Sequence, residues 1–297
     1  ERRKTARKKM LEVASALSGE DLKGDTLLIA TSGRYEFRNK GIDLLIDSLG
    51  ELNRQKKCNN QVVAFFLIPA NHYGARKDLL DNIAGSGNGE MEEKYLTHNL
   101  HYAEHDIILN RFRENDLNNL AGSVVKVVFV PSYLNGHDGI FDLPYYDVLI
   151  GLDLTVFPSY YEPWGYTPLE SLAFSIPTVT TTLAGFGRWV NKEFKQEQVP
   201  GIRVIPRDDF NDKEVVKGIG QAIMHHCGLD EKGRGEVNKG AYRISRIALW
   251  ESLINHYWRA YDHALGSASG KEIIIYDKER VEQLPETELA LVDIRPT

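Results

Sequence analysis

The sequence predicts an α/β fold, a Rossmann-like doubly wound parallel sheet flanked by helices. Short runs rich in β-branched and aromatic residues, bounded by turn residues, are typical of strands buried on both faces. They lie at residues 26–31, 62–68, 124–130, 154–157, 178–182 and 202–205. Segments with helical periodicity lie between them, at residues 41–53, 105–120, 145–151, 168–174 and 213–226. Because strands that alternate with helices pair in parallel, we expect one sheet with helices on both faces.

The same pattern predicts the domain organisation. Residues 1–20 are expected to form a basic amphipathic helix, which we interpret as a linker from an N-terminal domain outside the sequence. Residues 21–265 form the main domain, closed by one long helix over residues 242–265. Residues 266–297 are a flexible Gly/Ser linker and a tail with one strand-like run, KEIIIY. The sequence begins ERRKTARKK, with neither an initiator Met nor an apolar signal segment, so we expect a piece of a longer protein.

Composition and charge exclude several classes of protein. The 297 residues are 42% hydrophobic, which is enough for a sizeable core. With 36 Lys+Arg against 42 Asp+Glu the net charge is −6, which argues against a protein that coats nucleic acid or an anionic membrane. No apolar run approaches the roughly 20 residues of a membrane span. Two cysteines are too few for a disulfide framework, which favours a reducing, cytoplasmic location. A homo-oligomer stays an open alternative.

Two segments that follow predicted strands carry candidate functional residues, because ligands of open parallel sheets bind beyond the carboxyl ends of the strands. The first, SGRYEFRNKG at residues 32–41, places Arg34 and Lys40 just before a helix, where backbone N–H groups and the helix dipole favour an anion. A diphosphate site is one interpretation. The alternative is a solvated basic loop, since Lys and Arg in loops commonly face water.

The second segment, residues 158–170, reads PSYYEPWGYTPLE. Thr167 to Glu170 has the form of a capping box with Pro at the first helical position, so a helix start is expected here. Glu162 and Glu170 lie eight residues apart and could both face an anion docked on that helix end. Glu162 needs a cationic or hydroxyl partner, or else bears a desolvation cost. The aromatic residues of this segment either pack in the core or form a platform for a sugar or base; they are Tyr160, Tyr161, Trp164 and Tyr166.

A third group, His98, His101 and His105, has spacings that could place the three rings on one helix face. We expect no metal site there, because histidines in cores and on surfaces far outnumber metal ligands and the segment has no pattern of supporting carboxylates. The sequence also contains no Gly-x-Ser-x-Gly nucleophile elbow, P-loop or HExxH motif.

At its two candidate segments the chain resembles the glycogen synthases of the animal and fungal type, which are retaining glycosyltransferases built from two Rossmann-like domains. The resemblance rests on SGRYEFRNKG, on VFPSYYEPWGYTP followed by Glu170, and on TTLAGFG at residues 181–187. Weaker similarity covers residues 20–265. The resemblance implies that this chain is the C-terminal, donor-binding half of a GT-B type enzyme that transfers glucose from UDP-glucose or ADP-glucose to the non-reducing end of an α-1,4-glucan.

The resemblance also implies roles for individual residues. Arg34 and Lys40 match the basic pair that neutralises the donor diphosphate, and Glu162 matches the glutamate near the reacting centre. Glu170 matches the carboxylate that binds the ribose hydroxyls. Tyr145 matches the tyrosine that stacks on the base, with the adjacent Tyr146 as the alternative. The residues that match the phosphate end of the site are Trp164, Gly165, Tyr166 and Thr167, the last two through backbone N–H groups.

The partners expected from the resemblance are a nucleotide sugar, an α-glucan and an N-terminal domain of the same polypeptide. No metal or other cofactor is expected. Since no residue before position 20 could form the first Rossmann-like domain, we expect the isolated chain to bind nucleotide weakly and to turn over poorly or not at all. Two alternatives stay open: another retaining nucleotide-sugar transferase of the same architecture, and a non-catalytic module that binds glucan or nucleotide.

Overall fold

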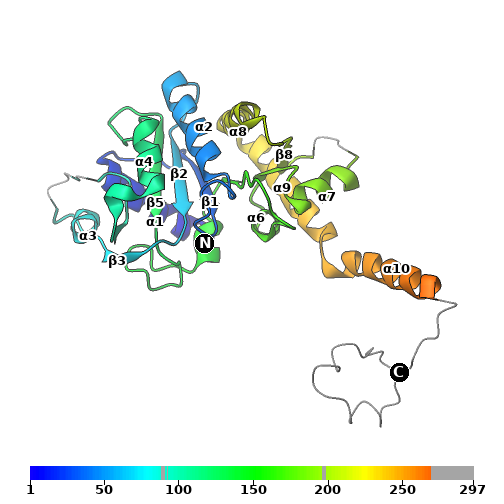
Figure 1. Ribbon diagram of the computed structural model, residues 1–297. Helices are drawn as coiled ribbons and strands as arrows, with labels where there is room; N and C mark the ends of the chain where they lie inside the picture. The colour runs from blue at the N-terminus through cyan, green and yellow to red at the C-terminus, as the bar shows by residue number, and fades with distance from the viewer. Residues whose placement is uncertain (88–90, 92, 196–198, 269–297) are drawn as a thin grey trace, which may run out of the picture. The chain divides into compact units, whose positions relative to one another are not determined.

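Six parallel strands form the central sheet, in the order β5-β2-β1-β6-β7-β8 (Figure 1). The computed structural model describes residues 1–87, 91, 93–195 and 199–268. The strands are β1 (Leu27–Ser32), β2 (Val62–Leu67), β5 (Val125–Val130), β6 (Leu154–Val156), β7 (Thr178–Thr181) and β8 (Ile202–Ile205). When these six strands are renumbered 1 to 6 along the chain, their order in the sheet is 3-2-1-4-5-6, as in the Rossmann fold. The predicted fold class is therefore confirmed.

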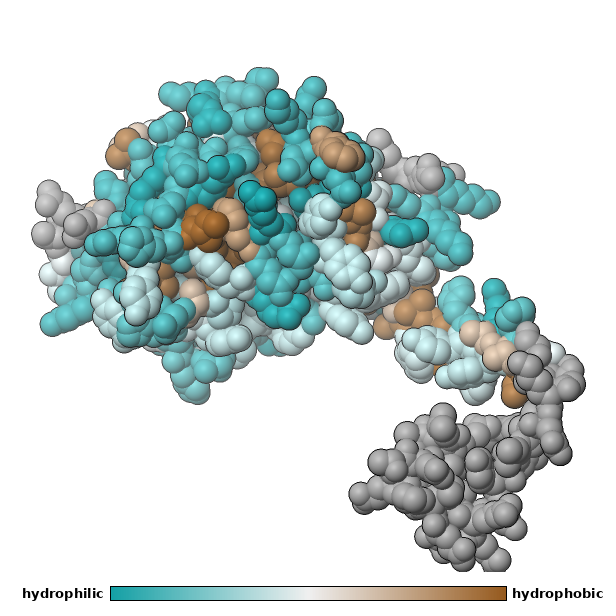
Figure 2. Space-filling view, viewed as in Figure 1, coloured by the Kyte–Doolittle hydropathy of each residue, from teal (hydrophilic) through white to brown (hydrophobic). Residues whose placement is uncertain are grey.

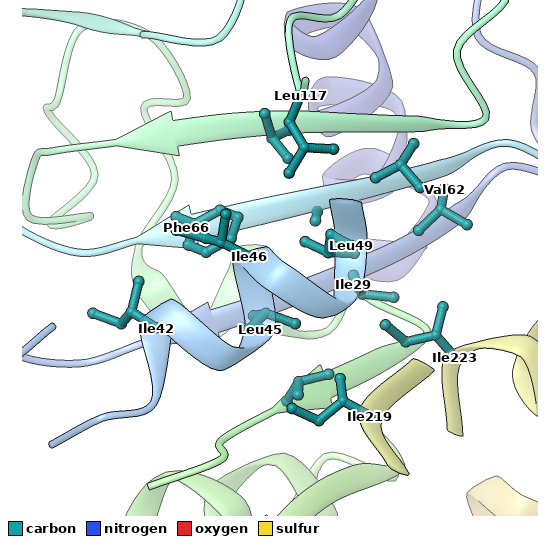
Figure 3. Packing of buried hydrophobic residues seen from close by; sticks show 14 of the residues in the cluster. Ile29, Ile42, Leu45, Ile46, Leu49, Val62, Phe66, Leu117, Ile219 and Ile223 are labelled. Atoms are coloured by element: carbon teal, nitrogen blue, oxygen red, sulfur yellow. The ribbon is translucent and has the colours of Figure 1, made fainter. Parts of the chain in front are cut away.

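One face of the sheet is covered by α2 (Ile42–Gln55), α4 (Ile107–Glu114) and α8 (Asp212–Cys227). Figure 3 shows the apolar side of α2 lying against the strands, with Ile219 and Ile223 of α8 beside it. The apolar residues of α2 recur at helical spacing, so they share one face of the helix. That face packs against the sheet and is buried. The packing fixes where α2 begins, and with it the loop that joins β1 to α2.

The opposite face is covered by α1 (Arg2–Ser18), the short α3 (Lys77–Ile83) and α5 (Tyr145–Leu149). Arg7 of α1 also donates to the Asp153 carboxylate at 2.7 Å. The predicted N-terminal helix is thus confirmed, and it belongs to the core. That it links to a preceding domain stays a prediction.

Near β7 and β8, a third apolar cluster joins α6 (Tyr166–Ala173), α7 (Gly185–Glu193) and α9 (Glu231–Ile247). Hydrophilic side chains cover most of the surface of residues 1–248 that is seen in Figure 2. No described helix is long and apolar enough to cross a membrane.

The structure departs from the sequence prediction at three elements. The helix predicted over residues 105–120 ends at Glu114, because Asp116 and Asn119 adopt positive φ and the buried Asn119 side chain bonds the backbone of Val127 instead. Two short strands, β3 (His72–Ala75) and β4 (His98–Leu100), form an antiparallel pair that periodicity did not reveal.

The third departure is at the closing helix. The prediction of one helix over residues 242–265 is wrong, because α9 ends at Ile247 and α10 (Trp250–Ala268) belongs to a separate compact unit that begins at Leu249. Aromatic side chains of α10 are exposed, among them Trp250 and Trp258. The strand-like run KEIIIY lies outside the described residues.

Candidate active site

The candidate site lies at the carboxyl ends of β1 and β6, which are neighbours in the sheet. Strands β2 and β5 lie on one side of β1, whereas β6, β7 and β8 lie on the other, so the order of the strands reverses here. In an open parallel sheet this switch point opens a crevice beyond the carboxyl ends of the two strands. Two loops meet there, which we call the β1 loop (residues 33–41) and the β6 loop (residues 157–165). The backbone N–H of Tyr160 donates to the carbonyl oxygen of Asn39 at 2.8 Å, which ties one loop to the other.

Gly41 allows the two loops to approach this closely. It precedes α2 with φ 66°, a left-handed conformation that glycine adopts without strain. A Cβ at this position would lie 1.9 Å from the carbonyl oxygen of Pro158. The β1 loop therefore requires glycine at position 41, both for its conformation and for its contact with the β6 loop.

Lys40 and Glu162 form an ion pair across the two loops. Their side chains are only 17% and 24% exposed, so both charges are partly removed from water. The aliphatic part of Lys40 passes Gly33, where a Cβ would lie 3.7 Å from Cε. The structure thus brings together two of the residues that the sequence singled out, and it supplies the cationic partner that Glu162 needs.

Arg34 lies on the same loop but faces solvent. Its side chain is 80% exposed and pairs with Glu36 at 2.9 Å. An exposed ion pair of this kind holds a side chain weakly, because water screens it and long side chains lose entropy when they are fixed. Glu36 therefore holds Arg34 only weakly in this position.

Sequence analysis missed Arg207, which follows β8 and contacts Pro158 and Tyr160 of the β6 loop. Its side chain is 4% exposed, donates to the Pro158 carbonyl oxygen and lies 5.2 Å from the centroid of the Tyr160 ring. Burial lowers the pKa of this guanidinium, and its Nε has no hydrogen-bond partner among the described residues. Its position just after a strand end is the signal that could have identified it.

The helix that follows the β6 loop starts earlier than predicted. Gly165, with φ 101°, is the N-cap of α6, and Tyr166 is its first residue. The predicted capping box is wrong: Thr167 lies inside the helix, no side chain caps its first turn, and Glu170 accepts from Tyr146. Pro168 falls within the first turn, where helical N–H groups have no intrahelical acceptor in any case.

The N-terminus of α6 therefore presents open donors. Gly165 has no side chain to cap the first turn, and among the described residues no protein acceptor takes the N–H groups of Tyr166 and Thr167. At α2, in contrast, the N–H groups of Gly41 and Ile42 already donate to carbonyl oxygens of the β1 loop. The helix dipole and these free donors make α6, rather than α2, the end suited to an anion.

Trp164 and the segment TTLAGFG support the site from within the core. The Trp164 ring contacts Phe186 and Trp189, with ring centroids 5.6 and 5.9 Å apart, so it is a packing residue. Gly185 donates its N–H to the Glu162 carbonyl oxygen at 3.0 Å, and a Cβ there would lie 2.1 Å from the Pro163 carbonyl oxygen. These contacts fix the backbone that carries Glu162.

Tyr145 and Tyr146 differ sharply in environment. Tyr145 is partly buried, with its hydroxyl 2.8 Å from that of Ser32, and burial raises the pKa of its phenol to about 12. Tyr146 is 47% exposed, and its hydroxyl donates to Glu170 at 3.0 Å. Tyr145 thus contacts the end of β1, and Tyr146 contacts Glu170 in the second turn of α6.

The three histidines do not share a helix face, so that prediction is wrong. His98 is buried in β4, where Nε2 lies 2.8 Å from the Asp138 carbonyl oxygen and Nδ1 lies 2.8 Å from the Thr97 hydroxyl. His101 and His105 are exposed. Within the described ranges, no group of three or more His, Cys, Asp or Glu side chains is arranged to hold a metal ion.

A concave region lies between α2, α4 and α8, with a volume of about 770 Å³. Its lining mixes basic and acidic side chains, including Arg38 and Arg111 against Asp43 and Asp47. Arg111 already pairs with Asp47 at 2.7 Å. We call this region the α2–α8 groove.

The chain matches the sequence profile of the family described as glycogen synthase over residues 19–84 and 89–291. It is 31% identical over 283 residues to the glycogen [starch] synthase of Caenorhabditis elegans, covering 77% of this chain. It is 30% identical to the liver glycogen [starch] synthase of Mus musculus and 29% identical to the glycogen [starch] synthase of Neurospora crassa, in both cases over 82% of this chain. The matched region spans 42% of the length of each of these relatives.

Solved structures show weaker similarity. Sucrose-phosphate synthase from Thermosynechococcus elongatus is 18% identical, with a TM-score of 0.45 over 86% of this chain and 49% of that one. WaaG, a glycosyltransferase involved in lipopolysaccharide biosynthesis, is 14% identical, with a TM-score of 0.42 over 80% of this chain and 46% of that one. Since the family profile covers most of its length, the chain belongs to the glycogen synthase family.

Proposed function

We propose that this chain is the donor-binding half of a glycogen synthase, which transfers glucose from UDP-glucose to the non-reducing end of an α-1,4-glucan with retention of configuration. The observation that carries the proposal is the Lys40–Glu162 ion pair at the switch point of the sheet, beside the open N-terminus of α6. A cation, a carboxylate and free backbone donors meet in one crevice. A glycosyl diphosphate has complementary chemistry, with an anionic leaving group next to a sugar carbon.

The reaction breaks the bond between glucose and phosphate, which leaves positive charge on the sugar and negative charge on the nucleoside diphosphate. In the proposed complex Lys40 turns to the diphosphate, and the N–H groups of Tyr166 and Thr167 bind its oxygens. Arg34 closes over it from the solvent side. Electrostatic stabilisation of this kind contributes several kcal/mol, on the order of 3 kcal/mol per well-placed donor, and the scheme includes no metal ion.

Glu162 can act on the sugar once Lys40, its partner in the ion pair, binds the diphosphate instead. In the free protein its charge is balanced by Lys40. With Lys40 bound to phosphate, the Glu162 carboxylate can orient the glucose hydroxyls and stabilise the positive charge that develops at the reacting carbon. The acceptor hydroxyl then attacks from the same face as the departing diphosphate and passes its proton to the oxygen of that leaving group, so Glu162 need not form a covalent bond.

Glu170 and Tyr145 are proposed to bind the nucleoside, with Glu170 accepting from the ribose hydroxyls and Tyr145 contacting the base. Tyr145 contacts Ser32 at the end of β1, and Glu170 accepts from Tyr146, the residue that follows Tyr145. The acceptor glucan is assigned to protein outside these residues, because the matched region is 42% as long as the relatives it resembles. A donor site without its acceptor site binds substrate but turns it over poorly.

Calorimetric titration of the 297-residue chain with UDP, ADP and UDP-glucose tests the proposal. We expect UDP to bind, and binding to be lost in the double variant Arg34→Ala, Lys40→Ala. A double variant on α8 and α9, Lys217→Ala, Arg243→Ala, removes the same charge from exposed positions and should bind like the unmodified chain. Failure of a folded chain to bind any of the three ligands contradicts the proposal, and tighter binding of ADP than of UDP contradicts the choice of donor.

A further inference from the structure

Tyr146 holds the Glu170 carboxylate through a contact that the proposed function does not use. Tyr146 stands in the first turn of α5 and Glu170 in the second turn of α6, and the phenol donates to Oε1 of Glu170 at 3.0 Å. The hydrogen bond raises the pKa of the phenol, so Tyr146 is a neutral donor over the physiological pH range. One oxygen of the carboxylate is therefore engaged before any ligand arrives.

The Tyr146 ring is itself held in place. It stacks on Phe174, with centroids 5.3 Å apart and planes inclined by 28°, and its centroid lies 5.4 Å from that of Tyr145. Phe174 caps the carboxyl end of α6, the helix that carries Glu170. Tyr146 thus bridges α5 and α6, and two aromatic neighbours restrict the direction in which its hydroxyl points.

We propose that Tyr146 is a positioning residue for the nucleoside: by occupying Oε1 of Glu170, it fixes the carboxylate so that Oε2 accepts from the vicinal hydroxyls of a ribose. The inference rests on the proposed function, which assigns the ribose to Glu170. A carboxylate has lone pairs for about four hydrogen bonds, so one phenol leaves enough capacity for a diol. Fixing a glutamate in advance removes the entropy that ordering it on binding would otherwise cost.

The first part of the test compares two ligands and three forms of the chain: unmodified, Tyr146→Phe and Tyr242→Phe. The ligands are UDP and its 2′,3′-dideoxy analogue, which lacks the ribose diol. Tyr146→Phe keeps the ring and its stacking on Phe174 and removes only the hydroxyl. Tyr242 on α9 is similarly exposed, at 49%, so Tyr242→Phe is a matched control outside the site. Thermal unfolding verifies that all forms fold.

We expect Tyr146→Phe to weaken UDP binding by about threefold to tenfold, as for loss of one hydrogen bond. The affinity for the dideoxy analogue should be the same in all three forms. In a Glu170→Ala background, Tyr146→Phe should have no further effect on UDP, because the residue acts through Glu170.

The other outcomes contradict either the role of Tyr146 alone or the proposed function as well. Equal or tighter UDP binding by Tyr146→Phe contradicts the inference alone, and tighter binding would mean that the phenol competes with the ribose. An equal loss for both ligands shows a general structural effect and also contradicts it. If the folded, unmodified chain binds no UDP, the proposed function fails and the inference fails with it.

Discussion

In the Lys40–Glu162 pair, each of two partly buried charges has a partner of opposite charge. A phosphate can take the place of Glu162 as the partner of Lys40. Neither side chain is exposed by more than 24%, whereas Arg34 on the same loop is 80% exposed. A charge–charge contact gains strength as water is excluded, so the two cations of the β1 loop should contribute unequally to phosphate binding.

Single variants measure that inequality. Lys40→Ala should weaken UDP binding by about tenfold or more, since it removes a charged donor from a partly desolvated position. Arg34→Ala should weaken it only about twofold to threefold, because water screens the exposed guanidinium. Calorimetric titration of each variant with UDP gives the two ratios. The opposite order would mean that Arg34 moves into the crevice and becomes the main phosphate ligand.

Tyr145 gives a prediction that depends on pH. Burial raises the pKa of its phenol from 10.0 to about 12, so the folded chain holds this proton more tightly than the unfolded chain. The contribution to stability is fully present below pH 10 and is lost as the pH rises through 12.

Tyr145→Phe should therefore reduce the loss of stability between pH 10 and 12, although it also removes the contact with Ser32. Urea unfolding at a series of alkaline pH values measures this slope. Tyr242→Phe, which removes an exposed phenol outside the site, is the control for the loss of one tyrosine. Identical slopes for Tyr145→Phe and the unmodified chain would contradict the assignment of the raised pKa to Tyr145.

At the scale of elements, the site depends on how closely the β1 and β6 loops approach. Gly41 permits the approach, the Tyr160 N–H and the Asn39 carbonyl oxygen connect the loops, and Arg207 holds the Pro158 carbonyl oxygen. The two loops are thus positioned by contacts to their backbone, so a small change at the junction should affect both stability and binding.

Gly41→Ala tests the junction. The added Cβ would meet the Pro158 carbonyl oxygen at 1.9 Å, in a left-handed conformation. We expect a loss of about 2 kcal/mol or more in the free energy of unfolding, together with weaker UDP binding. Gly235→Ala is the control: it lies in α9 with no atom within 4 Å of the added Cβ. That change should raise stability by about 0.5–1 kcal/mol. Equal stability of the two variants would contradict a tight junction.

The elements that the sequence predicted best are those with a strong local signal. The strands of the sheet matched apolar β-branched runs, because a strand buried on both faces has an unmistakable composition. The failures arose where a distant contact outweighed a local preference. The residues around Thr167 have the sequence pattern of a capping box. In the structure, however, Gly165 is the N-cap of the helix and Glu170 accepts a hydrogen bond from Tyr146. Likewise, the spacing of His98 suggested a helix, but the residue pairs in an antiparallel strand.

For the whole molecule, the strand order matters more than any single motif. The order β5-β2-β1-β6-β7-β8 places the end of β1 beside the end of β6, although 122 residues separate Lys40 from Glu162. Sequence analysis could identify both residues but not their contact, since pairing over that distance depends on the complete sheet. The contact of Arg207 with the Pro158 carbonyl oxygen also depends on the complete sheet, because it forms only once β8 has joined β7, although the position of Arg207 after a strand could have marked it as a candidate.

A crystal structure of the chain with UDP tests the central claim most directly, because it distinguishes the switch point from the α2–α8 groove as the place where a charged ligand binds. We predict that the diphosphate lies in the crevice at the switch point, within hydrogen-bonding distance of the N–H groups of Tyr166 and Thr167 and of the Lys40 ammonium, with the Lys40–Glu162 pair opened. UDP bound instead in the α2–α8 groove, with that pair intact, would contradict the account.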